Sequence, residues 1–170
     1  MEATVRRIVT GHDDQGRSVV VEDATVPMRG RLHELWLVPS VPARYGGVPE
    51  LAPPPTDLEP PSGGVLVRFV RFEPTEHLER DALEQRYAES FSALNATHAR
   101  VDTRRHPSMH KTTSVDYGIV LSGRITLLLD EGERDLAPFD VVIQRGTNHG
   151  WVNRGTEPAL MAFVLIGGTE

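Results

Sequence analysis

The stretch DYGIVLSGRITLLLDEGERDLAPFDVVIQRGTNHGWVN, residues 116–153, decides the fold class of this chain. Short runs of apolar and β-branched residues alternate in it with turn signals, among them Ser122-Gly123 and Asp130-Glu131-Gly132. No segment with helical spacing separates these runs. Short strands at this spacing are typical of an antiparallel sandwich or barrel. We therefore predict an all-β architecture in which this stretch forms most of the barrel.

The expected strands follow the turn signals along the chain. In this half they are residues 117–121, 125–130, 141–144, 149–152 and 159–166, and upstream they are 18–22, 35–38 and 64–72. In the last of these, Val65, Val67 and Phe69 form an apolar face, whereas the opposite face carries Arg68. Alternation does not decide which face points inward. The segment 11–16 is rich in turn residues and is interpreted as a hairpin connection.

Two other segments interrupt the strands. Residues 39–64 are dense in proline and glycine and predict a long surface loop. Residues 76–94 predict one helix packed outside the barrel, with Thr75 as its cap. The organisation we expect is a single domain over residues 1–170, with N-terminal strands and loop in 1–75, the helix in 76–94 and the barrel in 105–167.

Composition excludes several classes of function. The chain has 170 residues, a formal net charge of −6 and no cysteine. An acidic chain has no electrostatic reason to bind nucleic acid or anionic membrane. No apolar run approaches the roughly 20 residues of a membrane span, so the cytoplasm is the expected location. Without thiolates, a metal site must use His, Asp, Glu or backbone oxygen.

Three side chains form the candidate site. On extended strands His110 shares a face with Thr112, and His149 shares one with Trp151. Two histidines and the carboxylate of Asp116, facing one interior from different strands, can converge on a divalent cation. The plainer alternative is that these histidines are ordinary core or surface residues.

The same residues resemble the cupin family. The first family motif has two histidines, a glutamate and a glycine; here that register holds His110, Thr112, Asp116 and Gly123. The second motif agrees at Asp140, Gly146, His149 and Asn153, with Phe139 in place of a glycine and Gln144 in place of a proline. The chain is most similar to single-domain bacterial cupins of uncharacterised function. The resemblance implies an RmlC-like jelly-roll barrel with an N-terminal strand extension.

The resemblance also implies a ligand set and a partner. His110, Asp116 and His149 would bind zinc, iron(II), manganese or nickel, with Thr112 replacing the second motif histidine. Because a threonine hydroxyl is a poor ligand, a metal-free site is the alternative. Cupins associate through their N-terminal strands, which implies a homodimer with Val65, Val67 and Phe69 partly buried between subunits.

The function that we expect is an enzyme acting on a small polar or acidic metabolite. A metal-assisted lyase, either a dehydratase or a decarboxylase, is the favoured reaction class, with His106 and His110 moving protons. Thr112, Gln144 and Trp151 are the expected substrate contacts. The alternatives are a non-haem iron(II) oxygenase with the same ligands and a non-catalytic barrel that binds a small ligand.

Overall fold

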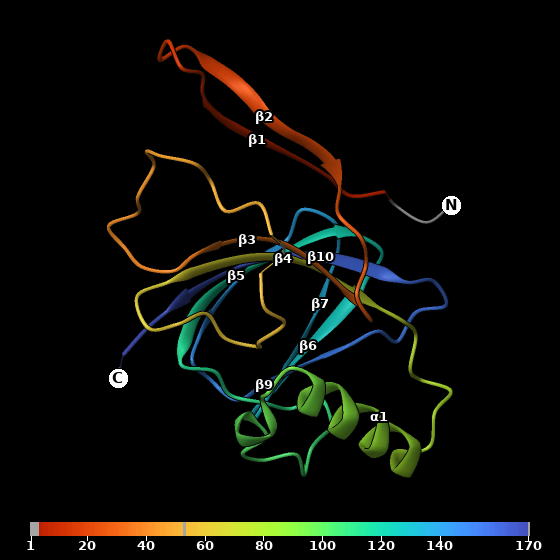
Figure 1. The fold of residues 1–170 in the computed structure, drawn as a ribbon. Helices are drawn as coiled ribbons and strands as arrows, with labels where there is room; N and C mark the ends of the chain where they lie inside the picture. The colour runs from red at the N-terminus through yellow and green to blue at the C-terminus, as the bar shows by residue number, and fades with distance from the viewer. Residues whose placement is uncertain (1–3, 53, 170) are drawn as a thin grey trace.

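The computed structural model describes residues 4–52 and 54–169 of the chain. Strands dominate it, together with one α-helix and a short 3-10 turn (Figure 1). The elements are β1 Arg6–His12, β2 Ser18–Thr25, β3 Leu32–Val38, β4 Val65–Phe72, α1 Arg80–Ala93, η1 Thr97–Ala99, β5 Ser114–Ser122, β6 Ile125–Leu129, β7 Glu133–Leu136, β8 Val141–Arg145, β9 His149–Val152 and β10 Ala159–Gly167.

The strands form an antiparallel jelly roll. One sheet has the order β3-β4-β10-β5-β8, and the facing sheet has the order β7-β6-β9. The main core cluster draws on both sheets, with Val120 and Phe163 from the first and Leu127 and Trp151 from the second. In the part of the chain that the structure describes, the two sheets do not join into one closed ladder. The predicted all-β cupin-type fold is confirmed.

Differences from the sequence prediction lie at the ends of elements and in short strands. The strand β7 was not predicted, because its sequence Glu-Arg-Asp-Leu has no apolar alternation. The hairpin of β1 and β2 uses segment 11–16 as its turn, as expected, with Asp13 Oδ1 accepting bonds from the backbone of Gln15 and Arg17.

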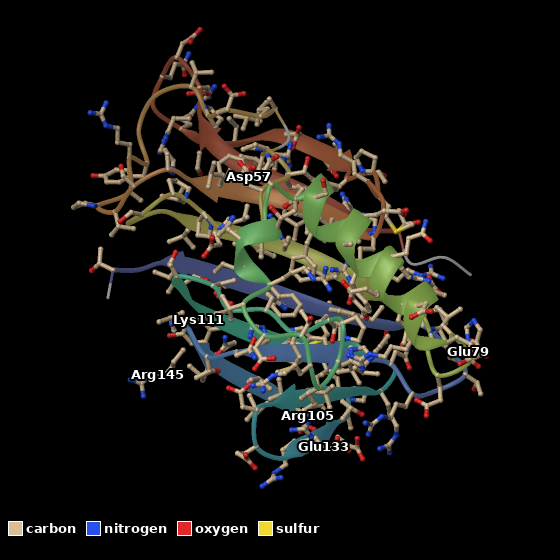
Figure 2. All side chains as sticks on the ribbon, turned by 90° about the horizontal axis from the view of Figure 1, so that it is seen from below. Asp57, Glu79, Arg105, Lys111, Glu133 and Arg145 are labelled. Atoms are coloured by element: carbon tan, nitrogen blue, oxygen red, sulfur yellow. The ribbon has the colours of Figure 1, made fainter. Side chains whose placement is uncertain are left out.

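The predicted helix start was wrong. The helix α1 begins at Arg80, not at residue 76, and the hydroxyl of Thr75 does not cap it: this oxygen is buried with no hydrogen-bond partner among the described residues. Leu83, Tyr87 and Phe91 form its buried face. The helix lies outside the strands, at one end of the barrel (Figures 1 and 2). None of the described helices is long and apolar enough to cross a membrane.

The burial pattern of β4 settles which of its faces points inward. Leu66, Arg68, Val70 and Phe72 are buried, whereas the alternate residues of this strand are only partly buried. The charged Arg68 therefore lies on the interior face, together with the apolar side chains of Leu66, Val70 and Phe72. The apolar face that the sequence emphasised points outward.

The proline-rich loop is irregular, as predicted, but its end is not confined to the surface. Leu58 packs against the main core cluster, and the carbonyl oxygens of Asp57 and Leu58 accept hydrogen bonds from Arg68. Glu59 accepts a hydrogen bond from the Thr113 hydroxyl at 2.9 Å. The loop thereby closes one side of the barrel interior beside β4 and β5.

Candidate functional site

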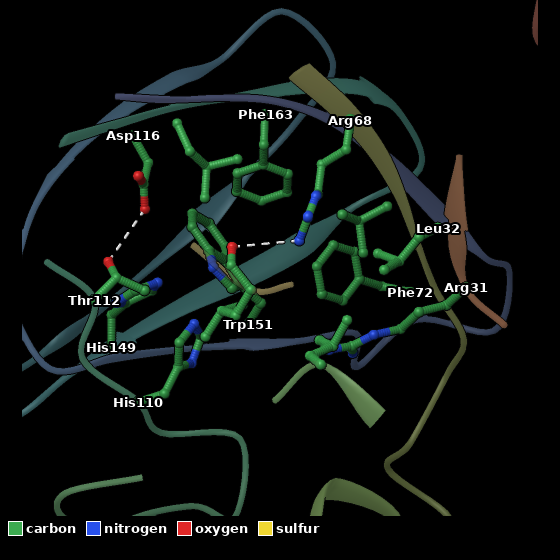
Figure 3. Close-up of a pocket in the computed structure, with 14 residues that line it drawn as sticks. Arg31, Leu32, Arg68, Phe72, His110, Thr112, Asp116, His149, Trp151 and Phe163 are labelled. Carbon is green, nitrogen blue, oxygen red and sulfur yellow. Dashed lines mark hydrogen bonds between the residues drawn. The ribbon is translucent and has the colours of Figure 1, made fainter. Parts of the chain in front are cut away.

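A cavity of about 60 Å³ lies inside the barrel, where the two sheets face each other. Its polar lining consists of Arg31, Arg68, His110, Thr112, Asp116 and His149 (Figure 3). Leu32, Phe72, Trp151 and Phe163 are among its apolar walls. The cavity is small for a ligand site, since such pockets usually measure about 300–1,000 Å³. It suits one end of a substrate, such as a single functional group.

Two histidines are brought together by backbone pairing. The backbone N–H of His110 donates to the carbonyl of His149 at 2.8 Å, and the reverse bond measures 2.9 Å. This isolated bridge sets the segment before β5 against β9. The imidazole rings consequently lie with centroids 4.3 Å apart and planes tilted by 45°. The register of this bridge therefore fixes both rings at the cavity wall.

Each imidazole has its Nδ1 atom engaged away from the cavity. His110 Nδ1 donates to the carbonyl of Ser108 at 2.9 Å, and His149 Nδ1 lies 2.7 Å from Nε2 of Gln144. In both rings Nε2 is the nitrogen left for the cavity. Burial lowers the pKa of His149 to about 4, and burial together with the neighbouring His149 lowers the pKa of His110 well below its usual value. Both rings are therefore neutral at pH 7.

Asp116 extends from β5 into the same cavity. Its Oδ2 accepts a hydrogen bond of 3.5 Å from the hydroxyl of Thr112, and its Oδ1 is buried with no partner among the described residues (Figure 3). Burial raises the pKa of Asp116 to about 6. A carboxyl group with this pKa can exchange a proton near neutral pH, and its unpartnered oxygen is free to contact a substrate.

The three predicted metal ligands share the cavity, yet they do not form a preformed ligand cluster. Among residues 4–52 and 54–169, no group of three or more His, Cys, Asp or Glu side chains is arranged to hold a metal ion. Thr112 occupies the place of a fourth ligand, and its hydroxyl is directed to Asp116. As the three side chains lie here, they do not form a ligand cluster. Whether these residues bind one stays a prediction.

An ion pair forms another part of the cavity wall. Arg68 Nε lies 3.1 Å from Oε2 of Glu34, and both side chains are buried. The same guanidinium donates to the carbonyls of Asp57 and Leu58. Burial raises the pKa of Glu34, and it lowers that of Arg68. These bonds direct Arg68 mainly toward protein groups.

The remaining predicted site residues divide between the cavity and its surroundings. Thr112 and Trp151 line the cavity, in agreement with their predicted position. His106 does not: its Nδ1 lies 2.7 Å from the Ser108 hydroxyl, and its ring packs against Tyr87. Gln144 does not line the cavity either; its side-chain amide contacts Nδ1 of His149, the ring nitrogen directed away from the cavity. The alternation of side chains along a strand predicted the positions of Thr112 and Trp151. The positions of His106 and Gln144 depend instead on chain bends near Pro107 and Gly146.

One cavity residue was missed by sequence reasoning altogether. Arg31 immediately precedes β3 and lines the cavity from the side opposite Asp116 (Figure 3). The sequence offers no signal for it, because nearly every basic residue of this chain is an arginine. Asn153, in contrast, has a structural role: its side-chain amide donates to the carbonyls of Phe72 and Glu157.

A jelly roll with histidines and a carboxylate lining its interior defines a cupin-type protein. The comparison with family models agrees, since residues 99–166 match the family described as "Cupin domain". This part of the chain is a cupin domain, and the resemblance predicted from the two motifs is confirmed.

The relatives include fungal proteins. The "Phomopsin biosynthesis cluster protein C'" of Diaporthe leptostromiformis is 55% identical over 60 residues, which is 34% of this chain and 32% of that protein. A "Cupin-domain-containing oxidoreductase" of Aspergillus ruber is 29% identical over 167 residues, covering 95% of this chain and 72% of that protein. The chain thus spans about a third of the first of these relatives.

Among solved structures, a "Cupin 2 conserved barrel domain protein" from Salinispora arenicola is similar to this chain. The two share 19% sequence identity with a TM-score of 0.38. The alignment covers 68% of this chain and 71% of that one.

Proposed function

We propose that the barrel cavity is the active site of an enzyme that acts on a small organic substrate, and that Asp116 is its proton-transferring residue. One observation carries the proposal: a buried carboxyl group with a pKa of about 6 faces the cavity, and one of its oxygens has no hydrogen-bond partner among the described residues. General acid–base catalysis is most efficient when the pKa of the catalytic group lies near the working pH. The two histidines, whose pKa values lie much lower, are weaker candidates for moving protons.

The reaction class that we favour is a lyase step, the dehydration of a hydroxy acid or a related carbonyl compound. Asp116 in its carboxylate form removes the proton from the carbon next to the carbonyl. The carbon–carbon double bond forms as the bond to the hydroxyl group breaks. Asp116 then returns the proton to the departing oxygen, which leaves as water. A residue that accepts and returns one proton suits dehydration better than decarboxylation.

The histidines have supporting roles in this proposal. With its Nδ1 accepting from Gln144, His149 carries its proton on Nε2, so that it donates a hydrogen bond into the cavity. Such a donor stabilises the negative charge that develops on the substrate carbonyl oxygen. His110, which donates through Nδ1 to Ser108, presents Nε2 as an acceptor for a substrate hydroxyl or N–H group.

The direct test is turnover of a panel of 3-hydroxy acids, followed by the ultraviolet absorbance of the unsaturated product and by deuterium uptake from heavy water. Asp116→Asn keeps the shape of the side chain and removes its basicity. It should lower the rate by about 100-fold or more. Glu131→Gln, which changes an exposed carboxyl in the turn after β6, is the matched control and should have no effect. Equal rates for Asp116→Asn and the wild type would refute the assignment.

A second candidate is a redox enzyme, favoured by the similarity to proteins named as oxidoreductases, such as that of Aspergillus ruber. In that case His110, Asp116 and His149 would be the ligands of iron(II), as the motif resemblance implies. Elemental analysis of protein purified without chelators tests the ligand set. His149→Ala should lower the metal content, and equal content in mutant and wild type would rule out the assignment. Ligand binding without any turnover would instead favour a non-catalytic barrel.

A further inference from the structure

Arg31 occupies the boundary between two cavities. Besides the barrel cavity, it lines an outer cavity of about 550 Å³, which we call the vestibule; Arg29, Thr56, Glu73, Arg86 and Glu89 also line it. Arg31, Leu32 and Leu94 line both cavities. The vestibule therefore lies next to the barrel interior, beside the start of β3 and the end of α1, with these three side chains between the two cavities.

The side chain of Arg31 is held in place by its surroundings. Its backbone carbonyl accepts a hydrogen bond of 2.8 Å from the N–H of Arg71, which anchors it to the edge of β4. The guanidinium carbon lies 5.5 Å from the centroid of the Phe72 ring. Figure 3 shows the side chain running past Phe72 toward the part of the cavity that His110 lines. The residue is thus directed inward.

This guanidinium has no counter-ion in the described part of the chain. Its Nε atom is buried without a hydrogen-bond partner, and no ion pair joins Arg31 to a described carboxylate. The two carboxylates that line the vestibule are engaged elsewhere: Glu73 pairs with Arg71 at 2.6 Å, and Glu89 accepts from Gln85 at 2.9 Å. The nearby charges of Arg68 and Arg86 have the same sign as that of Arg31.

Arg68, which lines the same cavity, differs from Arg31 in having a partner for its charge. Its charge is neutralised by Glu34, and its remaining donors reach two backbone carbonyls. Arg31 has neither arrangement. Burying a charge is costly unless the charge is paired, so a partly buried guanidinium whose Nε has no partner among the described residues favours the binding of an anion from outside the protein. The planar fork of arginine matches the two oxygens of a carboxylate.

We propose that Arg31 is the anion-binding residue of this cavity and that the substrate is a small organic carboxylate. The carboxylate group enters through the vestibule and pairs with Arg31. Its apolar part lies along Leu32 and Phe72, so that the reacting carbon points toward Asp116. The inference rests on the proposed function, because it takes the barrel cavity as the substrate site, and it adds the chemical class of that substrate.

The experiment measures binding of simple probes to the full chain by ligand-observed NMR. Benzoate and propionate should bind the wild type, whereas their neutral amides should bind at least about 10-fold more weakly. Arg31→Met keeps much of the aliphatic stem and removes the charge, and it should weaken benzoate by roughly 10- to 100-fold. Arg145→Met removes the same charge from an exposed position at the end of β8, which points away from the barrel, and should leave affinity unchanged (Figure 2).

Several outcomes would overturn the proposal. They are no binding of either carboxylate to the wild type, unchanged benzoate affinity in Arg31→Met, and tighter binding of inorganic phosphate than of benzoate. Arg31→Lys keeps the charge but loses the planar fork, and it should weaken benzoate by about 3- to 10-fold. This variant provides the test if Arg31→Met does not fold.

The binding and catalytic proposals can fail separately. Asp116→Asn should retain benzoate binding within about threefold, because Arg31 supplies the main contact to the carboxylate. Turnover in Asp116→Asn at the wild-type rate would refute the catalytic role of Asp116 and leave the Arg31 subsite intact. Conversely, unchanged benzoate affinity in Arg31→Met, together with loss of turnover in Asp116→Asn, would refute the Arg31 subsite and leave the catalytic role of Asp116 intact.

Discussion

The side-chain amide nitrogen of Gln144 lies 2.7 Å from Nδ1 of His149. The same nitrogen donates to the carbonyl of Thr147 at 2.7 Å, and Oε1 of Gln144 accepts from the Thr147 hydroxyl at 2.6 Å. These bonds fix the orientation of the amide. The Thr147 carbonyl also lies 3.0 Å from His149 Nδ1. Because the amide nitrogen of Gln144 can only donate, its closer contact requires His149 Nδ1 to accept, which places the proton of the ring on Nε2.

Replacing this donor with an acceptor should move the proton of His149. In Gln144→Glu, a carboxylate faces Nδ1, so that the imidazole is expected to carry its proton there and its pKa should rise. The ring nitrogen chemical shifts of His149 in ¹⁵N NMR report this tautomer directly. Gln85→Glu on the exposed face of α1 is the matched control. Unchanged ring shifts in Gln144→Glu would show that Thr147 alone sets the tautomer.

Asp116→Asn should alter how the stability of the protein depends on pH. Since the folded pKa of about 6 exceeds the ordinary value of 3.8, the folded state holds its proton more strongly than the unfolded state. This group therefore favours folding at low pH, and that contribution is lost as the pH rises from about 4 to about 6. Asp116→Asn should escape this loss and gain up to about 3 kcal/mol over the wild type above pH 7.

Urea unfolding at pH 4, 5.5 and 7.5 measures the effect of Asp116→Asn. The free-energy difference between mutant and wild type should grow with pH and level off above about pH 7. The low pKa values of the two histidines act in both proteins and cancel in this difference. Glu131→Gln should show no such trend. A difference that is constant across the three pH values would contradict the buried state of Asp116.

Breaking the ion pair of Arg68 and Glu34 should destabilise the barrel strongly. Both residues are only 2% exposed, so Arg68→Met leaves Glu34 as an uncompensated buried charge. The expected loss in the free energy of unfolding is about 3–5 kcal/mol. The double variant Arg68→Met with Glu34→Leu removes both charges and should recover most of that loss. Additive losses in the double variant would show that the two charges do not interact.

Assembly as a homodimer is expected from the family resemblance. Apolar side chains on two outer surfaces favour it: Ile8 and Val20 on the hairpin of β1 and β2, and Val141 and Ile143 on β8 are exposed. Light scattering at micromolar concentration should give about twice the 18.8 kDa of one chain. If the wild type is a dimer, the variant Val141→Lys should shift it toward the monomer. A monomeric mass of the wild type that persists as concentration rises would contradict the prediction of a dimer.

The sequence determined the strand architecture and most of the cavity face. Alternation and turn residues in 116–153 decide antiparallel strands because side chains on a strand have a period of two. The same period predicted that His149 lies with Trp151 and that His110 lies with Thr112. Both pairs line the cavity, although residues 110–112 precede β5 and contribute only the isolated bridge at His110. The spacing of these residues also carried the resemblance to cupins, which the family match over residues 99–166 confirms.

The tertiary structure alone decided which groups are buried without partners. Arg31 and Arg68 look alike in sequence, yet one has a carboxylate partner from a neighbouring strand and the other has none among the described residues. Gln144 supports His149 only because a turn at Gly146 folds the chain back between them. The pKa of Asp116 likewise depends on burial by residues from several strands. Local periodicity fixes which way a side chain points, whereas pairing and desolvation depend on residues far apart in the chain.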